Sequence, residues 1–389
     1  MNERVYLDWN ATAPLRPEAR AAMIVALELT GNASSVHVEG RTARQAIENA
    51  RAQVAALVGA QPRDVTFTSG ATEANMLALT PAIAVGGRKA RRDRLFFSAT
   101  EHPSVGSGGR FPAGGIEELP VDGDGLIDLH ALRRALARAE HPLVSVMLAN
   151  NETGVIQPIA EIAHIVHDAG GLLHVDAVQG AGRVDCRMDE LGADLLTLSS
   201  HKLGGPQGAG ALVCRSDIQI DEPLIRGGGQ ERGRRAGTEN VAANAGFGAA
   251  CAAALAARQS DAVRMAALRD RLEAGLKAIA PQTVIFGAGA PRLPNTTLFA
   301  VPGMTAGTAI IAFDLNGIAL SSGSACSSGR VQPSTVLSAM GVEPELARGA
   351  LRASLGWTTS ENDVDKLLNA WRKVVSSLLK KQTKEGIAA

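Results

Sequence analysis

The stretch Leu195 to Cys214, LLTLSSHKLGGPQGAGALVC, contains two short apolar runs separated by a polar turn that carries one lysine. LLTL and GALVC have the length of buried strands and are bounded by turn residues, which predicts two strands of one sheet with Lys202 in the turn between them. A turn lysine is usually a solvated surface charge. The functional alternative is a lysine whose amine forms a Schiff base, which requires burial or a cationic neighbour to lower its pKa.

An acidic residue at the end of an upstream strand favours the Schiff-base role of Lys202 over a surface charge. Leu172 to Gln179, LLHVDAVQ, predicts a strand that ends in Asp176, and ligands bind at the carboxyl ends of strands in open α/β sheets. Alone, Asp176 would be read as a helix cap or a turn acid. Together with Lys202 it indicates a site for pyridoxal phosphate (PLP), in which the amine holds the aldehyde and the carboxylate keeps the pyridine nitrogen protonated.

Composition excludes several classes of protein. The chain has 389 residues, with 39 Lys and Arg against 39 Asp and Glu. This balance argues against nucleic acid or an anionic membrane as a partner, because both attract a basic surface. The N-terminus has no apolar core of signal-peptide length, and the Ala-rich run 241–257 is short for a bilayer span. The four cysteines are far apart and form no CxxC pair, so we expect no disulfide framework, no metal site and a cytoplasmic location; they are Cys186, Cys214, Cys251 and Cys326.

The order of predicted elements indicates an α/β protein with two domains. Strands and helices alternate from about residue 65 to residue 214, a pattern typical of right-handed crossovers and a mainly parallel sheet. From about Asp261 the pattern changes to a smaller α+β arrangement. We expect a large PLP-binding domain over residues 16–258 and a small domain formed by residues 1–15 and 259–389.

Further polar residues follow predicted strands at the ligand edge. Gly70 to Glu73 lies between a strand and a helix N-terminus, where backbone N–H groups and the hydroxyl of Thr72 can bind a phosphate; the plain alternative is a helix cap. His102 and Asn151 each come after an apolar strand. A lone histidine there is more often structural, but an imidazole can also stack on a flat cofactor and carry protons.

Two segments in the second half of the chain carry other chemistry. Residues 226–240, RGGGQERGRRAGTEN, could be read as an RNA-binding segment, but the stretch is short and contains Glu231 and Glu239, so an anionic small ligand is favoured. Cys326 lies among serines and glycines in SSGSACSSG, a setting for an accessible and reactive thiol; a passive loop cysteine is the alternative. Arg352 lies within a predicted strand, where an arginine requires an anion.

Eight segments together resemble the cysteine desulfurases of the NifS/IscS type, within the class V aminotransferase group of PLP enzymes. They occur in the same order as in that family, and the arginine and glycine segment is most similar to the nitrogen-fixation NifS branch. The segments are SGATEAN, TEHPSV, ANNETG, HVDAVQ, SSHKLGGPQG, RGGGQERGRRAGTEN, SSGSACSSG and LRASLG. The resemblance implies the aspartate aminotransferase-like fold of PLP-dependent transferases.

The resemblance also implies a role for each matching residue. Lys202 would be the Schiff-base lysine, Asp176 would pair with the pyridine nitrogen, His102 would stack on the ring and Gln179 would bond its phenolic oxygen. The phosphate would be held by Ala71, Thr72, Ser199 and His201, with Thr238 from the second subunit of a homodimer. The substrate carboxylate would be received by Asn32, Asn151 and Arg352.

The implied reaction removes sulfur from L-cysteine. Cys326 would take the sulfur as a persulfide, L-alanine would be released, and Lys202 and His102 would carry protons. The sulfur would pass to a scaffold or acceptor protein of iron–sulfur cluster assembly, in which Cys326 can contact the cluster. Two positions depart from the family pattern, Ser200 in place of glycine and Trp9 in the N-terminal motif. A selenocysteine lyase or an aminotransferase of the same fold is the alternative, although neither needs the cysteine segment.

Overall fold

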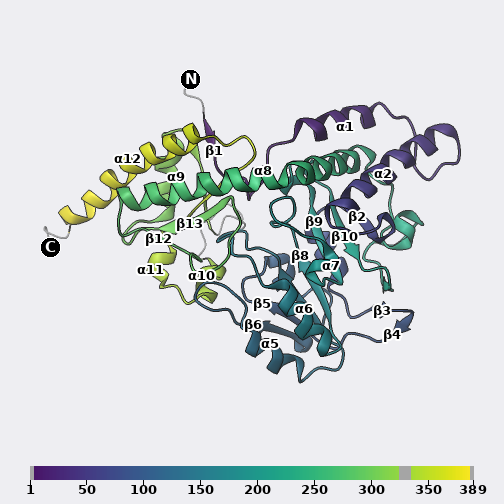
Figure 1. The fold of residues 1–389 in the computed structure, drawn as a ribbon. Coiled ribbons are helices and arrows are strands. Elements are labelled where there is room, and N and C mark those ends of the chain that lie inside the picture. The colour runs from purple at the N-terminus through teal and green to yellow at the C-terminus, as the bar shows by residue number, and fades with distance from the viewer. Residues whose placement is uncertain (1–3, 324–333, 386–389) are drawn as a thin grey trace.

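A seven-stranded sheet forms the centre of the larger part of the molecule (Figure 1). The computed structural model describes residues 4–323 and 334–385. Strand order is β2-β10-β9-β8-β7-β5-β6, and every neighbouring pair is parallel except the two pairs made by β10. The mainly parallel sheet is therefore confirmed. The strands are β2 (Val65–Thr68), β5 (Leu95–Ser98), β6 (Ile116–Leu119), β7 (Leu143–Met147), β8 (Leu172–Asp176), β9 (Leu195–Ser199) and β10 (Gly210–Cys214).

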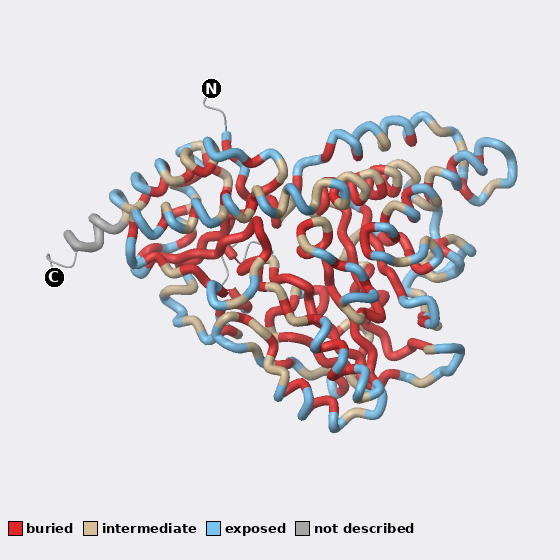
Figure 2. The backbone as a smooth tube through the Cα atoms, in the orientation of Figure 1, coloured by how far each residue is buried: buried red, intermediate tan, exposed pale blue. Residues whose placement is uncertain are grey.

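Both faces of this sheet are covered, which explains why its strands read as continuous apolar runs. Phe96 of β5 points into one core, whereas its neighbours Leu95 and Phe97 point into the other, as the two-residue period of a strand requires. Figure 2 shows the buried strands between more exposed helices.

Helices cover one face, and the other face carries two short helices and a small sheet. The first core includes side chains of α2 (Val38–Leu57), α5 (Leu129–Leu136), α6 (Ile159–Asp168), α7 (Met188–Leu191) and α8 (Val241–Ile279). The second includes side chains of α3 (Ala71–Ala78), α4 (Pro103–Gly106), β3 (Ile83–Val85) and β11 (Ile218–Ile220); β4 (Arg88–Lys89) pairs with β3. Helix α1 (Pro17–Leu27) packs on α8.

The smaller part is built on a four-stranded sheet of order β12-β13-β16-β15. Its core surrounds Trp371, which is fully buried and stacks on Phe313 at 6.1 Å between ring centres. The elements are β12 (Val284–Ile285), β13 (Thr296–Ala300), β15 (Ser321–Ser322), β16 (Leu351–Ser354), α9 (Ala306–Leu315), α10 (Thr335–Ala339), α11 (Pro344–Ala347) and α12 (Glu361–Glu385), with β1 (Val5–Tyr6) parallel to β14 (Ile318–Ala319). The N-terminal strand thus joins the C-terminal part of the chain.

Helix α8 differs from the sequence-based prediction. The Ala-rich run 241–257 and the change of pattern at about Asp261 indicated two separate elements. The structure instead has one helix of 39 residues, because no glycine or proline interrupts 249–274. By length and composition alone α8 could cross a membrane, and 44% of its most apolar window is buried inside the protein. A core helix passes the same test. Its packing against α1 and α2 identifies it as one.

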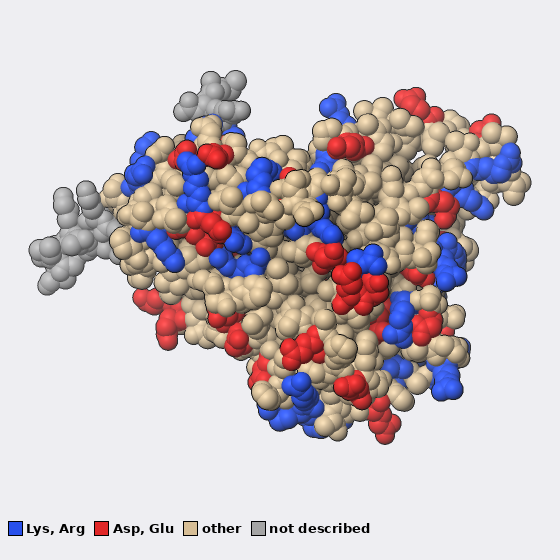
Figure 3. All heavy atoms as spheres, viewed as in Figure 1, with Lys and Arg blue, Asp and Glu red and all other residues tan. Residues whose placement is uncertain are grey.

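Charges of both signs are interspersed over the face shown in Figure 3. The balanced composition is thus spread over this surface rather than separated into large single-sign regions.

Candidate functional site

A cavity of about 710 Å³ opens at the carboxyl ends of β7, β8 and β9. Its walls combine residues from the central sheet, the segment after β1 and the strand β16. Most of the residues predicted from sequence line it: Ala71, Thr72, His102, Asn151, Asp176, Gln179, Ser199, His201, Lys202 and Arg352. Segments far apart in the chain therefore form one site.

Lys202 ends a short 3-10 helix, Ser200–Lys202, between the antiparallel strands β9 and β10. Its Nζ donates to the main-chain oxygens of Asn10 at 2.6 Å and Ala11 at 2.7 Å. Just after this turn, Gly210 lies against the turn between β2 and α3, because a Cβ at Gly210 would fall 2.6 Å from the Gly70 carbonyl carbon. Only glycine permits this approach. The amine is therefore held inside the cavity.

Asp176 is the last residue of β8 and is only 5% exposed. Its Oδ1 accepts a hydrogen bond from the Val178 N–H at 3.0 Å, and its Oδ2 accepts one from Asn75 Nδ2 at 2.9 Å. These two donors fix the orientation of the buried carboxyl group. A carboxylate in this position can pair with a protonated ring nitrogen.

His102 is held in one tautomer by its neighbours. Its Nδ1 accepts from the Ser104 N–H at 3.1 Å and lies 2.8 Å from Ser104 Oγ. Asn75 Nδ2 donates to that same Oγ at 2.9 Å, so the hydroxyl hydrogen is free to point at Nδ1. The ring proton therefore lies on Nε2. Burial lowers the pKa of His102, the nearby Asp176 raises it, and Lys202 lowers it.

The opposite end of the cavity is suited to an anion. The N-terminus of α3 presents Ala71 and Thr72, and its first N–H groups have no partner within the helix. Ser199 adds a hydroxyl. His201 adds an imidazole, whose Nδ1 lies 3.2 Å from Thr12 Oγ1. Burial and then the charge of Lys202 lower the pKa of His201 to about 4, so the ring is neutral at pH 7.

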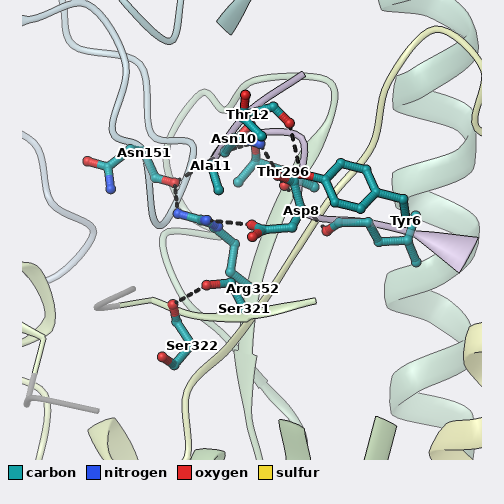
Figure 4. A network of polar contacts seen from close by, with 12 residues as sticks. Tyr6, Asp8, Asn10, Ala11, Thr12, Asn151, Thr296, Ser321, Ser322 and Arg352 are labelled. Atoms are coloured by element: carbon teal, nitrogen blue, oxygen red, sulfur yellow. Dashed lines mark hydrogen bonds and ion pairs between the residues drawn. The ribbon is translucent and has the colours of Figure 1, made fainter. Parts of the chain in front are cut away.

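Arg352 lies at the side of the cavity formed by β16 and the N-terminal segment (Figure 4). Its side chain is 2% exposed; Nη1 donates to the Asn151 main-chain oxygen at 2.9 Å and Nη2 to Asp8 Oδ1 at 2.7 Å. Its Nε is buried and has no hydrogen-bond partner among the described residues. The guanidinium as a whole lines the cavity, where its positive charge can attract a carboxylate.

Sequence reasoning missed four residues of this site. Asn10 accepts from Lys202 through its main-chain oxygen, and Asp8 pairs with Arg352. Asn75 and Ser104 connect Asp176 to His102. One signal was available for Asn75, since it lies one helical turn after Thr72 on α3. The roles of the others depend on contacts across distant segments.

Three predicted residues are not among those lining the cavity. Asn32 is exposed, and its Oδ1 accepts from the Ser34 N–H at 2.8 Å. Thr238 is exposed in the segment before α8. Cys326 lies outside the described residues.

The two departures from the family motifs leave the cavity lining intact. Trp9 is buried and packs edge-on against Trp357, with ring centres 4.6 Å apart. The side chain of Ser200 is buried next to Gly205, where a Cβ at Gly205 would meet Ser200 Oγ at 2.2 Å. Neither residue lines the cavity.

Comparisons with known proteins agree on one class of enzyme. Residues 5–367 match the aminotransferase class-V family. A cysteine desulfurase of Cereibacter sphaeroides is 42% identical over 382 residues, covering 97% of each chain, and cysteine desulfurase IscS of Dictyoglomus turgidum is 39% identical, covering 97% of this chain and 96% of that relative. The crystal structure of a NifS-like protein from Rickettsia africae superposes with a TM-score of 0.86 at 37% identity, covering 96% of this chain and all of that one.

Proposed function

This chain belongs to the class V aminotransferase family and is a PLP-dependent cysteine desulfurase, and we propose that the residues of its cavity and Cys326 divide the reaction as follows. The observation that supports this division is the meeting of Lys202, Asp176 and Arg352 in one cavity. The substrate is L-cysteine.

The cavity has the donor set that PLP requires. Ala71, Thr72 and Ser199 offer hydrogen bonds to its phosphate, Asp176 offers a carboxylate to its ring nitrogen, and Lys202 offers an amine to its aldehyde. When bound, the cofactor withdraws electrons from the substrate, which acidifies its α-proton and weakens its Cβ–S bond.

Lys202 is the base that we assign to the α-proton. His102 Nε2 already carries a hydrogen, and His102 Nδ1 is engaged by the N–H and hydroxyl of Ser104. His102 therefore has no free lone pair to accept a proton. Its ring is placed to stack on the cofactor and to donate a hydrogen bond from Nε2.

Arg352 is the residue that we assign to the substrate carboxylate. Its guanidinium lines the cavity together with Asn151 and supplies a positive charge there. Binding the carboxylate there would orient the substrate, because two ends of the molecule would then be held at once.

Cys326 is the thiol that we assign to the sulfur atom. Its thiolate would attack the substrate sulfur and form an S–S bond while the Cβ–S bond breaks; the electron pair stays on Cβ, and protonation gives L-alanine. The described residues on both sides of 324–333 support this assignment. A Cβ at Gly323 would fall 2.5 Å from Glu152 Oε2, and Ser334 Oγ donates to the same oxygen at 2.6 Å. The flanking residues Gly323 and Ser334 thus both lie beside Glu152, the neighbour of Asn151.

The test is Cys326→Ala, with L-alanine and sulfide release measured from L-cysteine. We expect desulfuration to be abolished while PLP remains bound. Cys251→Ala is the matched control, because Cys251 is fully buried in α8 and should retain activity. Selenocysteine serves as a second substrate, since its better leaving group does not need an attacking thiol. Wild-type desulfuration by Cys326→Ala, with undiminished persulfide on the protein, would replace this proposal by a general PLP lyase.

We also propose a homodimer, in which Thr238 reaches the partner's phosphate site and Asn32 joins the partner's substrate site. An apolar surface on and after α1 supports it: Ile24, Leu27, Val36 and Val38 are 52% to 86% exposed. Sedimentation should show a dimer for the wild type and dissociation for Leu27→Glu, with Leu315→Glu on α9 as the control. A fully active wild-type monomer would contradict this proposal.

Three further proposals concern the setting of the enzyme. We propose the large domain over 16–258 and the small domain over 1–15 and 259–389, each with its own apolar core. We propose a cytoplasmic location, supported by three free buried cysteines. We propose that the sulfur passes to a scaffold or acceptor protein of iron–sulfur cluster assembly, which a persulfide transfer assay with purified scaffold would test.

A further inference from the structure

Arg183 is a buried cation that has no role in any step of the proposed reaction. It follows β8 in the turn that begins at Ala177, is 8% exposed, and lies behind Lys202 in a separate small cavity of about 30 Å³. No carboxylate of the described residues forms an ion pair with it. Burial, followed by the charges of Arg352 and Arg16, lowers the pKa of Arg183 to about 10. A buried charge without an opposite charge is costly to the fold, so its contacts need an explanation.

The contacts of Arg183 converge on one side chain of the active site. Its Nη1 donates to Gln179 twice at 2.7 Å, to the main-chain oxygen and to Oε1. Its Nη2 makes a longer contact with the Lys202 main-chain oxygen at 3.4 Å. Gln179 lines the main cavity, whereas Arg183 does not. Arg183 therefore contacts Gln179 from the side that faces away from the cavity.

The chemistry of these partners fixes the orientation of the Gln179 amide. Arginine has only donors, so the Gln179 atom next to Nη1 must be the oxygen. The other amide atom lies 3.0 Å from the Asn10 main-chain oxygen, which only accepts, so that atom must be the nitrogen. Nε2 has two hydrogens and one is used by Asn10. The second remains for the cavity.

We propose that Arg183 is a positioning residue that holds the Gln179 amide with Nε2 toward the cofactor oxygen and Oε1 away from it. Without Arg183, only the Asn10 oxygen among the described residues opposes rotation of the amide, and a rotated amide would present Oε1 to an oxygen that carries negative charge. The Asn10 oxygen also accepts from Lys202 Nζ. Hydrogen bonds therefore connect Arg183 to the Lys202 amine through Gln179 and the Asn10 oxygen. This inference rests on the proposed function, because it takes PLP as the occupant of the cavity.

A double-mutant cycle on the holoenzyme tests this role. The readouts are the position of the visible absorption band and the rate at which PLP is lost after dilution into buffer. Loss of one positioned hydrogen bond should speed PLP loss by about 3- to 10-fold in Arg183→Met and similarly in Gln179→Ala. In the double variant we expect no further change, because Arg183 acts through Gln179. Effects that multiply in the double variant would overturn the proposal.

Arg16→Met separates positioning from charge. Arg16 is also 8% exposed and donates to the Leu203 main-chain oxygen, but it stacks on Trp357 and makes no hydrogen bond to Gln179. We expect its PLP loss rate to stay within about twofold of wild type, with the absorption band unshifted. An Arg16→Met effect equal to that of Arg183→Met would show that charge alone matters. Arg183→Lys keeps the charge and should recover part of the wild-type PLP retention. It also serves as the second variant if Arg183→Met folds poorly.

The outcomes also separate this inference from the proposed function. If the wild type binds no PLP, or binds it without releasing sulfur from L-cysteine, the proposed function fails. If it does both and the double-mutant cycle is additive, only the role of Arg183 fails.

Discussion

Replacing Arg352 by methionine should weaken L-cysteine binding while the enzyme keeps its cofactor. Arg352 makes two hydrogen bonds in the structure, to Asn151 and Asp8, and its side chain is almost fully buried. In the described part of the chain, none of the residues proposed to hold the cofactor phosphate is hydrogen-bonded to it. The variant therefore removes the proposed carboxylate partner and leaves the phosphate end of the cavity as it is.

Two magnitudes follow from these contacts. A hydrogen bond to a charged group contributes about 1.5–3 kcal/mol, so the KM for L-cysteine should rise about 10- to 100-fold. The fold should lose less. Asp8 would be left without its partner, but its side chain is 22% exposed and regains water, so the stability cost should be about 1–2 kcal/mol.

The assay is L-alanine formation over a range of L-cysteine concentrations, with the visible absorption of bound PLP recorded in parallel. Arg348→Met is the matched control, because Arg348 has the same charge but is 61% exposed beyond α11. Its KM should equal that of the wild type. An Arg352→Met enzyme with unchanged KM would refute the assignment of the substrate carboxylate to this residue, even if kcat fell.

Three other outcomes test the remaining assignments. Lys202→Ala should lose the covalent link to PLP, and a borohydride-reducible yellow chromophore in that variant would contradict the role of the lysine. Burial raises the pKa of the Cys186 and Cys214 thiols to about 12, so iodoacetamide on the native protein at pH 7 should leave both unmodified, and peptide mapping that finds them alkylated would contradict this. Burial lowers the pKa of His174 to about 4; since the unfolded imidazole binds its proton near 6.5, the free energy of unfolding should fall by up to about 3 kcal/mol from this residue as the pH drops from 6.5 to 4. Urea unfolding of His174→Gln should show a shallower decline over that range, and an unchanged decline would assign it to other groups.

The sequence predicted the central sheet well because its signals are local. LLHVD and LLTL carry apolar side chains at most positions, as strands covered on both faces do, and the structure has β8 and β9 there. Lys202 and Asp176 were found for the same reason, since each comes directly at or after such a strand. Their meeting required only that adjacent parallel strands end at one edge.

Other parts of the site could not be predicted because they depend on contacts between distant residues. Asp8 and Arg352 are 344 positions apart, and nothing near either residue indicates the other. Ser104 received no role because its link to Asn75 spans 29 positions. The continuity of α8 was missed for a different reason, since a change from an Ala-rich to a charged composition resembles the end of an element although both halves favour a helix.

Helix α8 also limits how the two halves of the enzyme can move. At 1.5 Å per residue, its 39 residues form a strut of about 58 Å, and its side chains belong to the cores of both sheets. A hinge at residue 258 would have to break this helix in its middle, where no glycine or proline offers a pivot. The distance between Lys202, which we propose holds the cofactor, and Arg352, which we propose binds the substrate, is consequently set when the chain folds, and we expect it to stay constant during turnover.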